Sequence, residues 1–269
     1  MIESVTIEPE VTRPEVTGSV MIKSDSNGFV PLVLKERAFA FTSGATFREF
    51  AERSMDPALL RNRNHEVRLP VREQDYFINY PDHLHLIALV GEETPETAIV
   101  LPILARIGEG SPRFTFHVVC ETDNRTLLAG LVDEIDLSGD LSELDLPLLL
   151  AFDEEWIFQG QWGPHPQAAE SHLDVWFESN PEYAALAEDE TLAAQDKFAE
   201  LLTRLTHEMR IWYNSGLQAE CVREVQQFLA ELLVENESEQ NDIADLPQKG
   251  TISARSAEEE SEHQQEDAA

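Results

Sequence analysis

The segment Leu84–Val90 is apolar at almost every position, and a helix start follows it within a few residues. Apolar character over so short a run predicts a strand that is covered on both faces. The Thr94 hydroxyl can cap the next helix, and Pro95 suits the first helical position because the N–H it lacks would be unpaired there. That helix is expected to end near Gly108, and Phe114–Cys120 is the next predicted strand.

The alternation of helices and strands continues after residue 120. Asn124 is a candidate cap for a second helix. Leu146–Phe152 and Trp156–Trp162 are predicted to form a β-hairpin across a short acidic turn, and a proline-rich segment then opens a helix that runs through Phe177. The predicted order βαβαββα makes this an α/β fold with a central mixed sheet and flanking helices.

The N-terminal part is predicted to be less regular. Residues 1–44 are read as an extension in which Phe29–Phe41 forms a strand or a docking segment. The α/β domain is assigned to residues 45–180. It opens with Thr46-Phe47-Arg48-Glu49, whose hydroxyl and carboxylate have the spacing of a capping box. Residues 61–81 are expected to be irregular.

The part of the chain after the α/β domain is predicted to be helical and then disordered. Residues 181–234 carry two apolar stripes separated by Asn214-Ser215-Gly216, a typical helix end, so they are expected to form a helical hairpin. The stripes are Phe198, Leu201, Leu202, Leu205, Met209 and Trp212, then Val222, Val225, Phe228, Leu229, Leu232 and Leu233. Residues 235–269 hold 11 acids and two bases, and we expect an acidic disordered tail there.

The charge of the chain restricts its partners. Its formal net charge is −33, from 52 acids against 19 bases. Nucleic-acid binding and attachment to anionic lipid both need clusters of Lys and Arg, so neither partner is expected. The acidic charge favours solubility, and the alternative is recognition of a basic protein.

Several common chemistries have no motif in the sequence. The two cysteines, Cys120 and Cys221, lie far apart, and no CxxC or zinc-ligand spacing is present. Both are expected to be small buried core residues, with a redox role as the alternative. His83, His85 and His165 could meet at a metal only if the fold brought them together, and no cofactor or metal is expected. The absence of a basic, apolar leader and of a long apolar run predicts a cytoplasmic protein.

The motifs resemble those of the thioredoxin fold, and of a bacterial thioredoxin-like family in particular. Leu101-Pro102 resembles the Leu-Pro of the family's first helix, and Leu146-Pro147 its Ile-Pro before the third strand. Trp162-Gly163-Pro164-His165-Pro166 resembles its Trp-Gly-Pro-x-Pro segment, and Arg210-Ile211-Trp212-Tyr213 is similar to its late Leu-x-Trp-Tyr. The resemblance covers about residues 45–233. It implies a kink at Pro102 and a cis peptide bond at Pro147.

The resemblance also implies where the reactive cysteine would lie, and this chain departs from the family there. The family's reactive Cys aligns with Thr94, and the position three residues later is Thr97. Disulfide exchange needs a thiolate, and a Thr hydroxyl does not ionise near neutral pH. We therefore expect a redox-inactive module that binds a protein or peptide, with Thr94, Thr97 and Pro147 as candidate contacts. Equally, Thr94 can be an ordinary helix cap and Pro147 a bend without a ligand.

Two other functions remain open on the sequence alone. The chain could be a divergent thiol-disulfide oxidoreductase or thiol transferase that uses Cys120 or a bound low-molecular-weight thiol. It could also be a structural subunit whose helical hairpin completes a homodimer. The first alternative requires an exposed Cys120 with a depressed pKa.

Overall fold

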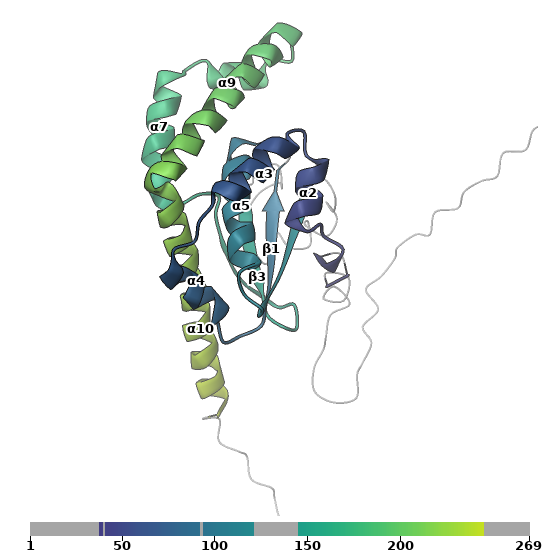
Figure 1. The fold of residues 1–269 in the computed structure, drawn as a ribbon, viewed down its shortest axis with the longest axis vertical. Coiled ribbons are helices and arrows are strands. Elements are labelled where there is room, and N and C mark those ends of the chain that lie inside the picture. Colours follow the sequence, from purple (N-terminus) through teal and green to yellow (C-terminus); the bar gives the residue numbers. More distant parts are fainter. Residues whose placement is uncertain (1–37, 40, 92–93, 121–144, 245–269) are drawn as a thin grey trace, which may run out of the picture. The chain divides into compact units, whose positions relative to one another are not determined.

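The fold is given by a computed structural model that describes residues 38–39, 41–91, 94–120 and 145–244 (Figure 1). The chain divides into two compact units, Met1–Ala230 and Glu231–Ala269. The predicted helix after Asn124 and most of the N-terminal extension lie outside the described residues.

The sheet has four strands and confirms the predicted mixed α/β class. Its strands are β1 (Leu84–Val90), β2 (Phe114–Cys120), β3 (Leu148–Phe152) and β4 (Phe158–Trp162), in the order β2-β1-β3-β4. β1 pairs with β2 in parallel and with β3 in antiparallel fashion. β3 and β4 form the predicted hairpin, with a register shift between Ala151 and Phe152. The strands β1 and β2 coincide with the predicted segments.

Both faces of the sheet are covered, as the apolar strands require. Helix α5 (Pro95–Gly108) continues through Pro102 and packs on β1 and β2. Successive strand residues point to opposite faces. Alternate residues such as Ile87 and Leu150 line one face, and they belong to a single hydrophobic cluster that also includes Phe41. Phe41 is fully buried, with its ring centroid 5.4 Å from that of Phe152, so this part of the predicted extension belongs to the core.

Short helices precede the sheet in the described part of the chain, and the prediction of irregular structure over residues 61–81 was wrong. They are α2 (Phe47–Arg53), α3 (Pro57–Glu66) and α4 (Val71–Ile78). The capping box at the start of α2 is confirmed. α3 begins where the Asp56 side chain accepts the Leu59 N–H. Helices this short show little periodicity, and α3 buries Arg63, so the apolar pattern did not reveal them.

The proline-rich segment after β4 leads into more helices. A 3₁₀ turn, η2 (Gln167–Ala169), joins directly to α7 (Glu170–Ser179), which confirms the predicted helix in this region. A further short helix, α8 (Tyr183–Glu188), packs on the helix that follows it.

The predicted helical hairpin does not form. α9 (Leu192–Trp212) passes through the π-helical segment η3 (Tyr213–Leu217) into α10 (Gln218–Ala244) without the reversal that a hairpin requires (Figure 1). The Gln218 N–H still bonds to the Tyr213 carbonyl, so a local change at Gly216, with φ 154°, kinks the helix instead of ending it. α10 also continues past residue 235 to Ala244, so the predicted disorder is wrong for that stretch. No described helix is both long and apolar enough to cross a bilayer.

Gly163 and Gly216 are two of the described glycines with a positive φ, and their surroundings are very different. Gly163 follows β4 with φ 137°, and a Cβ added there would lie 2.3 Å from the Pro147 carbonyl oxygen. Gly216 has φ 154°, and a Cβ there would meet nothing within 4 Å. Gly163 therefore needs both the backbone freedom and the small size of glycine, whereas Gly216 needs only the freedom.

We expect Gly163→Ala to destabilise the protein more than Gly216→Ala. Strain at a positive φ costs about 1–3 kcal/mol in either variant, and Gly163→Ala adds a clash with backbone. Urea unfolding followed by circular dichroism measures both free energies of unfolding. Equal losses would show that the close approach of Gly163 to Pro147 does not matter.

Candidate functional site

One edge of the sheet gathers most of the residues that the sequence singled out. β1 and β2 are parallel, so both end there, at Val90 and Cys120. β3 begins at this edge because Leu148 pairs with Leu89, and β4 ends there. Ligands of α/β sheets commonly bind beyond the carboxyl ends of parallel strands. We call Thr94, Thr97, Pro147, Trp162 and His165 the Thr94 edge.

The two threonines of the Thr94 edge close a short chain of hydrogen bonds. The Thr94 hydroxyl oxygen accepts the Thr97 N–H at 3.0 Å and donates to the Thr97 hydroxyl oxygen at 2.9 Å. The Thr97 hydroxyl in turn donates to the Gly91 carbonyl at 3.2 Å. Thr94 is half-buried and Thr97 is buried. The structure thus confirms Thr94 as an N-cap and places the two side chains in contact.

The proline-rich segment forms the opposite side of the Thr94 edge. The Leu146–Pro147 bond is cis, as the resemblance implied, and Pro147 is buried beneath Gly163. Trp162 and His165 are half-buried. Glu224 of α10 holds this segment, because its carboxylate accepts the Gln167 N–H at 3.1 Å and the Trp162 indole N–H at 3.4 Å. The exposed part of the edge is therefore made by Thr94, Trp162 and His165.

Two titratable groups near the Thr94 edge have shifted pKa values. Burial raises the pKa of the Glu96 carboxyl, and nearby Asp145 adds to the effect. Burial lowers the pKa of His165, although Glu170, Asp145 and Glu224 act in the opposite direction. The ring Nδ1 of His165 is buried and has no hydrogen-bond partner among the described residues. Both shifts favour neutral side chains at this edge.

Neither cysteine is placed for thiol chemistry. Cys120 ends β2 at the same edge of the sheet as Thr94 but is only 4% exposed, and Cys221 of α10 is fully buried. Neither forms a disulfide. Burial is the main cause that raises the pKa of Cys221, which opposes formation of a thiolate. The expectation that both residues are buried is confirmed, and the exposed Cys120 that the oxidoreductase alternative requires is contradicted.

The three histidines do not meet. His83 contacts Arg113 with its Nε2 2.7 Å from Nη1, and His85 stacks on Trp156 with ring centroids 3.9 Å apart. Both are near the start of β1, whereas His165 lies at the opposite edge of the sheet. Within the described part of the chain, no group of three or more His, Cys, Asp or Glu side chains is arranged to hold a metal ion.

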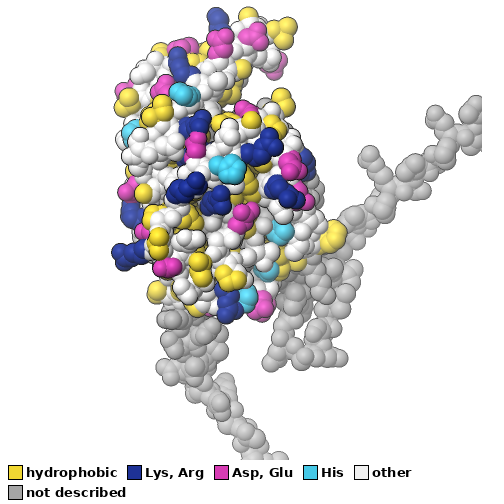
Figure 2. Space-filling model, in the orientation of Figure 1, with side chains coloured by type: hydrophobic (Ala, Val, Ile, Leu, Met, Phe, Trp, Pro, Cys, Tyr) yellow, Lys and Arg dark blue, Asp and Glu magenta, His cyan; other side chains and the backbone are white. Residues whose placement is uncertain are grey.

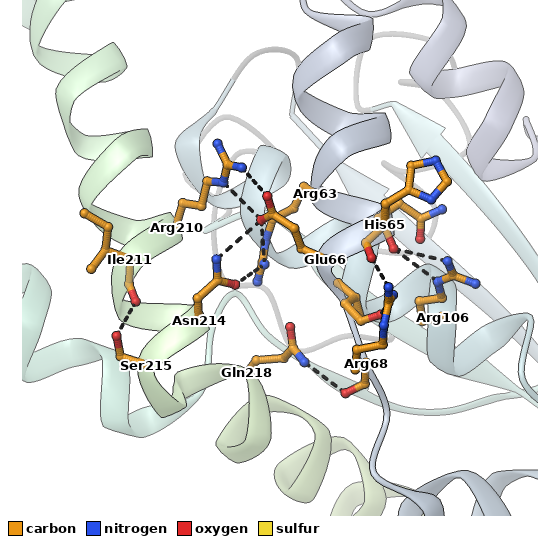
Figure 3. Close-up of polar contacts among 12 residues, drawn as sticks. Arg63, His65, Glu66, Arg68, Arg106, Arg210, Ile211, Asn214, Ser215 and Gln218 are labelled. Carbon is orange, nitrogen blue, oxygen red and sulfur yellow. Dashed lines mark hydrogen bonds and ion pairs between the residues drawn. The ribbon is translucent and has the colours of Figure 1, made fainter.

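A second polar cluster joins α3 to the end of α9. Figure 2 shows Lys and Arg side chains gathered over α3 and its neighbours, and Figure 3 shows the contacts among several of them. Arg63 is fully buried, and its Nη1 donates to the Asn214 Oδ1 at 2.6 Å. Its other contact is Glu66, which also pairs with Arg210. The Nε and Nη2 atoms of Arg63 have no hydrogen-bond partner among the described residues.

Three residues of these clusters could not be predicted from the sequence. The charge of Glu96 acts on Tyr183 of α8 and on Tyr213 of η3, which are far from it in sequence. Glu224 interrupts the apolar stripe between Val222 and Val225, which is a weak signal of an inward-facing polar group. Arg63 carried no signal, because it lies in a segment without recognisable periodicity.

Comparison with known proteins gives only distant structural neighbours. No protein-family model and no curated protein sequence matches the chain. A crystal structure of a protein of unknown function from Pseudomonas aeruginosa is 18% identical, with a TM-score of 0.42; the match covers 63% of this chain and 94% of that one. An HIV epitope-scaffold is 16% identical, with a TM-score of 0.46, and the match covers 72% of this chain and 96% of that one. Likenesses of this degree carry no conclusion about function.

We expect Glu96→Gln to stabilise the protein at neutral pH. The folded-state pKa of Glu96 lies above its ordinary value of 4.5, so the folded state binds this proton more tightly than the unfolded chain does. Its contribution to stability is fully present below the unfolded pKa and is lost as pH rises through the folded pKa. Thermal unfolding should therefore show a gain for Glu96→Gln at pH 7 that shrinks as pH falls through the folded-state pKa and is absent below pH 4.5.

Glu49→Gln is the matched control with the opposite sign. The backbone and side chain of Thr46 lower the pKa of Glu49, so its contribution is present above pH 4.5 and is lost as pH falls. This variant should lower the melting temperature at pH 7. A loss of stability at pH 7 in Glu96→Gln would contradict the assignment of Glu96 as a buried, disfavoured carboxylate.

Proposed function

We propose that this chain is a thioredoxin-like protein without a dithiol, whose Thr94 edge binds an extended peptide segment of a partner protein. The sheet order supports this proposal, because a parallel β1–α5–β2 unit followed by an antiparallel β3–β4 hairpin is the arrangement expected of that fold. The start of α5 also lies at the sheet edge where the resemblance places the reactive group.

One observation carries the proposal. The hydroxyl oxygens of Thr94 and Thr97 lie 2.9 Å apart at the helix start, where two cysteine sulfurs would have to meet. The Thr94 hydroxyl caps the helix, and the Thr97 hydroxyl bonds to the Gly91 carbonyl. The two side chains therefore lie in contact, as a pair of cysteines would, but neither supplies a nucleophile. An edge of this kind can hold a ligand and has no group that could exchange disulfides.

The exposed chemistry of the Thr94 edge suits a peptide. Trp162 offers a half-buried ring, and aromatic side chains contribute large contact areas to interfaces. His165 is also half-buried, so part of its ring is exposed at this edge. Recognition of an extended segment also relies on main-chain hydrogen bonds.

The two alternatives have less support. A thiol-disulfide oxidoreductase or transferase that uses Cys120 would need that sulfur to be accessible, and it is buried. A homodimer completed by a helical hairpin would need a hairpin that the structure does not contain. Binding without catalysis is therefore the function that agrees best with the described residues.

We expect Thr94→Cys/Thr97→Cys to acquire disulfide-exchange activity that the unmodified protein lacks. The new thiols would lie in contact at a helix start, which lowers the first thiol pKa below the value of about 8.5 for free cysteine. The measurement is dithiothreitol-driven reduction of insulin, whose chains must reach the Thr94 edge as extended peptide.

Thr94→Ser/Thr97→Ser is the matched control and should stay inactive, because it keeps the cap and adds no thiol. Mass spectrometry first establishes whether the two new cysteines form a disulfide. A folded double-cysteine variant without that disulfide would contradict the thioredoxin-like geometry. A variant that forms the disulfide and does not reduce insulin would contradict access of a peptide to the edge.

A further inference from the structure

The end of α3 carries arginines whose charges are not neutralised, although the chain as a whole is strongly acidic. Arg61 and Arg68 are exposed, and Arg106 of α5 is half-buried and bonds to the Asn64 carbonyl of α3. We call Arg61, His65, Arg68 and Arg106 the arginine patch. Arg61 and His65 lie one turn apart and so share a face of α3. None of the three arginines has a carboxylate within ion-pair distance among the described residues.

Backbone carbonyls, not carboxylates, hold two of these guanidinium groups (Figure 3). Arg106 donates from Nε and Nη2 to the Asn64 carbonyl at 3.3 and 3.2 Å. Arg68 donates from Nη1 to the carbonyls of His65 and Val67. These bonds satisfy the last carbonyls of α3, which carry the negative end of the helix dipole. Each arginine keeps its full charge and has N–H donors left over.

The base of the patch is held in place from several sides. The Gln218 side chain donates to the Arg68 carbonyl at 3.0 Å. Glu66, the carboxylate nearest in sequence, is already bound by Arg63 and Arg210. The positive charge of Arg106 also acts to lower the pKa of Glu109, although the two groups lie farther apart than an ion pair. A guanidinium that is already held in place loses less conformational freedom on binding than a mobile one does. These arginines are therefore suited to bind a carboxylate or another planar oxyanion.

We propose that the arginine patch binds a short acidic segment of a partner protein. The side chains span residues 61–68, which at 1.5 Å per residue is on the order of 10 Å. That length matches about three residues of an extended peptide, at roughly 3.3 Å each. Charge complementarity then joins carboxylates of the segment to the free donors of Arg61, Arg68 and Arg106.

The same observations argue against a long polyanion. A duplex or a lipid surface would extend well beyond the patch and meet a chain with a net charge of −33. Like charge beyond the contact would oppose binding at moderate ionic strength, where the Debye length is about 10 Å. A short acidic peptide avoids this repulsion. The patch is also near the C-terminal end of α5, whereas Thr94 caps its N-terminal end, so this surface is distinct from the Thr94 edge.

Fluorescence anisotropy of a labelled polyglutamate peptide with the full chain tests the proposal, with polyglutamine of equal length as the neutral probe. We expect polyglutamate to bind at about 0.1 M salt and to be released at about 1 M salt, where the Debye length falls to about 3 Å. Arg61→Gln should weaken binding about two- to fivefold, and Arg61→Lys should largely retain it. Arg61→Glu should weaken it further.

Arg223→Gln is the matched control, because Arg223 is also an exposed helical arginine but already pairs with Glu220. It should leave polyglutamate binding unchanged. Polyglutamate binding that is absent, or equally strong in Arg61→Glu, would overturn the proposal. Tighter binding of a DNA duplex or of phosphatidylserine vesicles would also overturn it in favour of those partners. Self-association that disappears in Arg61→Glu, measured by light scattering, would identify a second copy of the chain as the occupant.

Discussion

The buried guanidinium of Arg63 joins two parts of the chain that are far apart in sequence. A charge inside a protein is costly unless it is paired, and Arg63 is paired through Glu66 and Asn214. Asn214 lies in η3, so this contact fixes the end of α3 against the kink between α9 and α10. The same contact uses Glu66, which would otherwise neutralise part of the arginine patch. One cluster therefore joins α3 to α9 and η3 and also occupies Glu66, the carboxylate nearest in sequence to the arginine patch.

Helix α5 connects the two candidate binding surfaces. Its first turn carries Thr94 and Thr97 at the carboxyl end of β1, and its last turn carries Arg106 beside α3. The helix has 14 residues, so the surfaces are separated by roughly 20 Å. The two proposed contacts, at the Thr94 edge and at the arginine patch, therefore lie at opposite ends of one helix. Neither surface contains a group suited to covalent chemistry.

The strands and helix starts of the α/β domain could be predicted from the sequence, because their signals are local. Leu84–Val90 is apolar throughout, and Thr94-Pro95 has an explicit cap. The helices over residues 57–78 were missed because they are short and because α3 buries an arginine. The helix end predicted at Gly216 was wrong, since a π-helical turn can absorb a positive φ while the hydrogen bonds continue. Full burial of Arg63 and partial burial of Glu96 and Glu224 depend on contacts between distant elements, which no local pattern encodes.

The proposed function depends on the absence of a reactive thiol at the Thr94 edge. Thiol modification of the unaltered protein tests this central claim most directly. Iodoacetamide labelling, followed by mass spectrometry at a series of pH values, reports the reactivity of Cys120 and Cys221 separately. Because both are buried, labelling should require unfolding and should be slow in the native protein at every pH below denaturation. Rapid native labelling of Cys120, with a midpoint below the value of about 8.5 for free cysteine, would show that a reactive thiol does serve this edge.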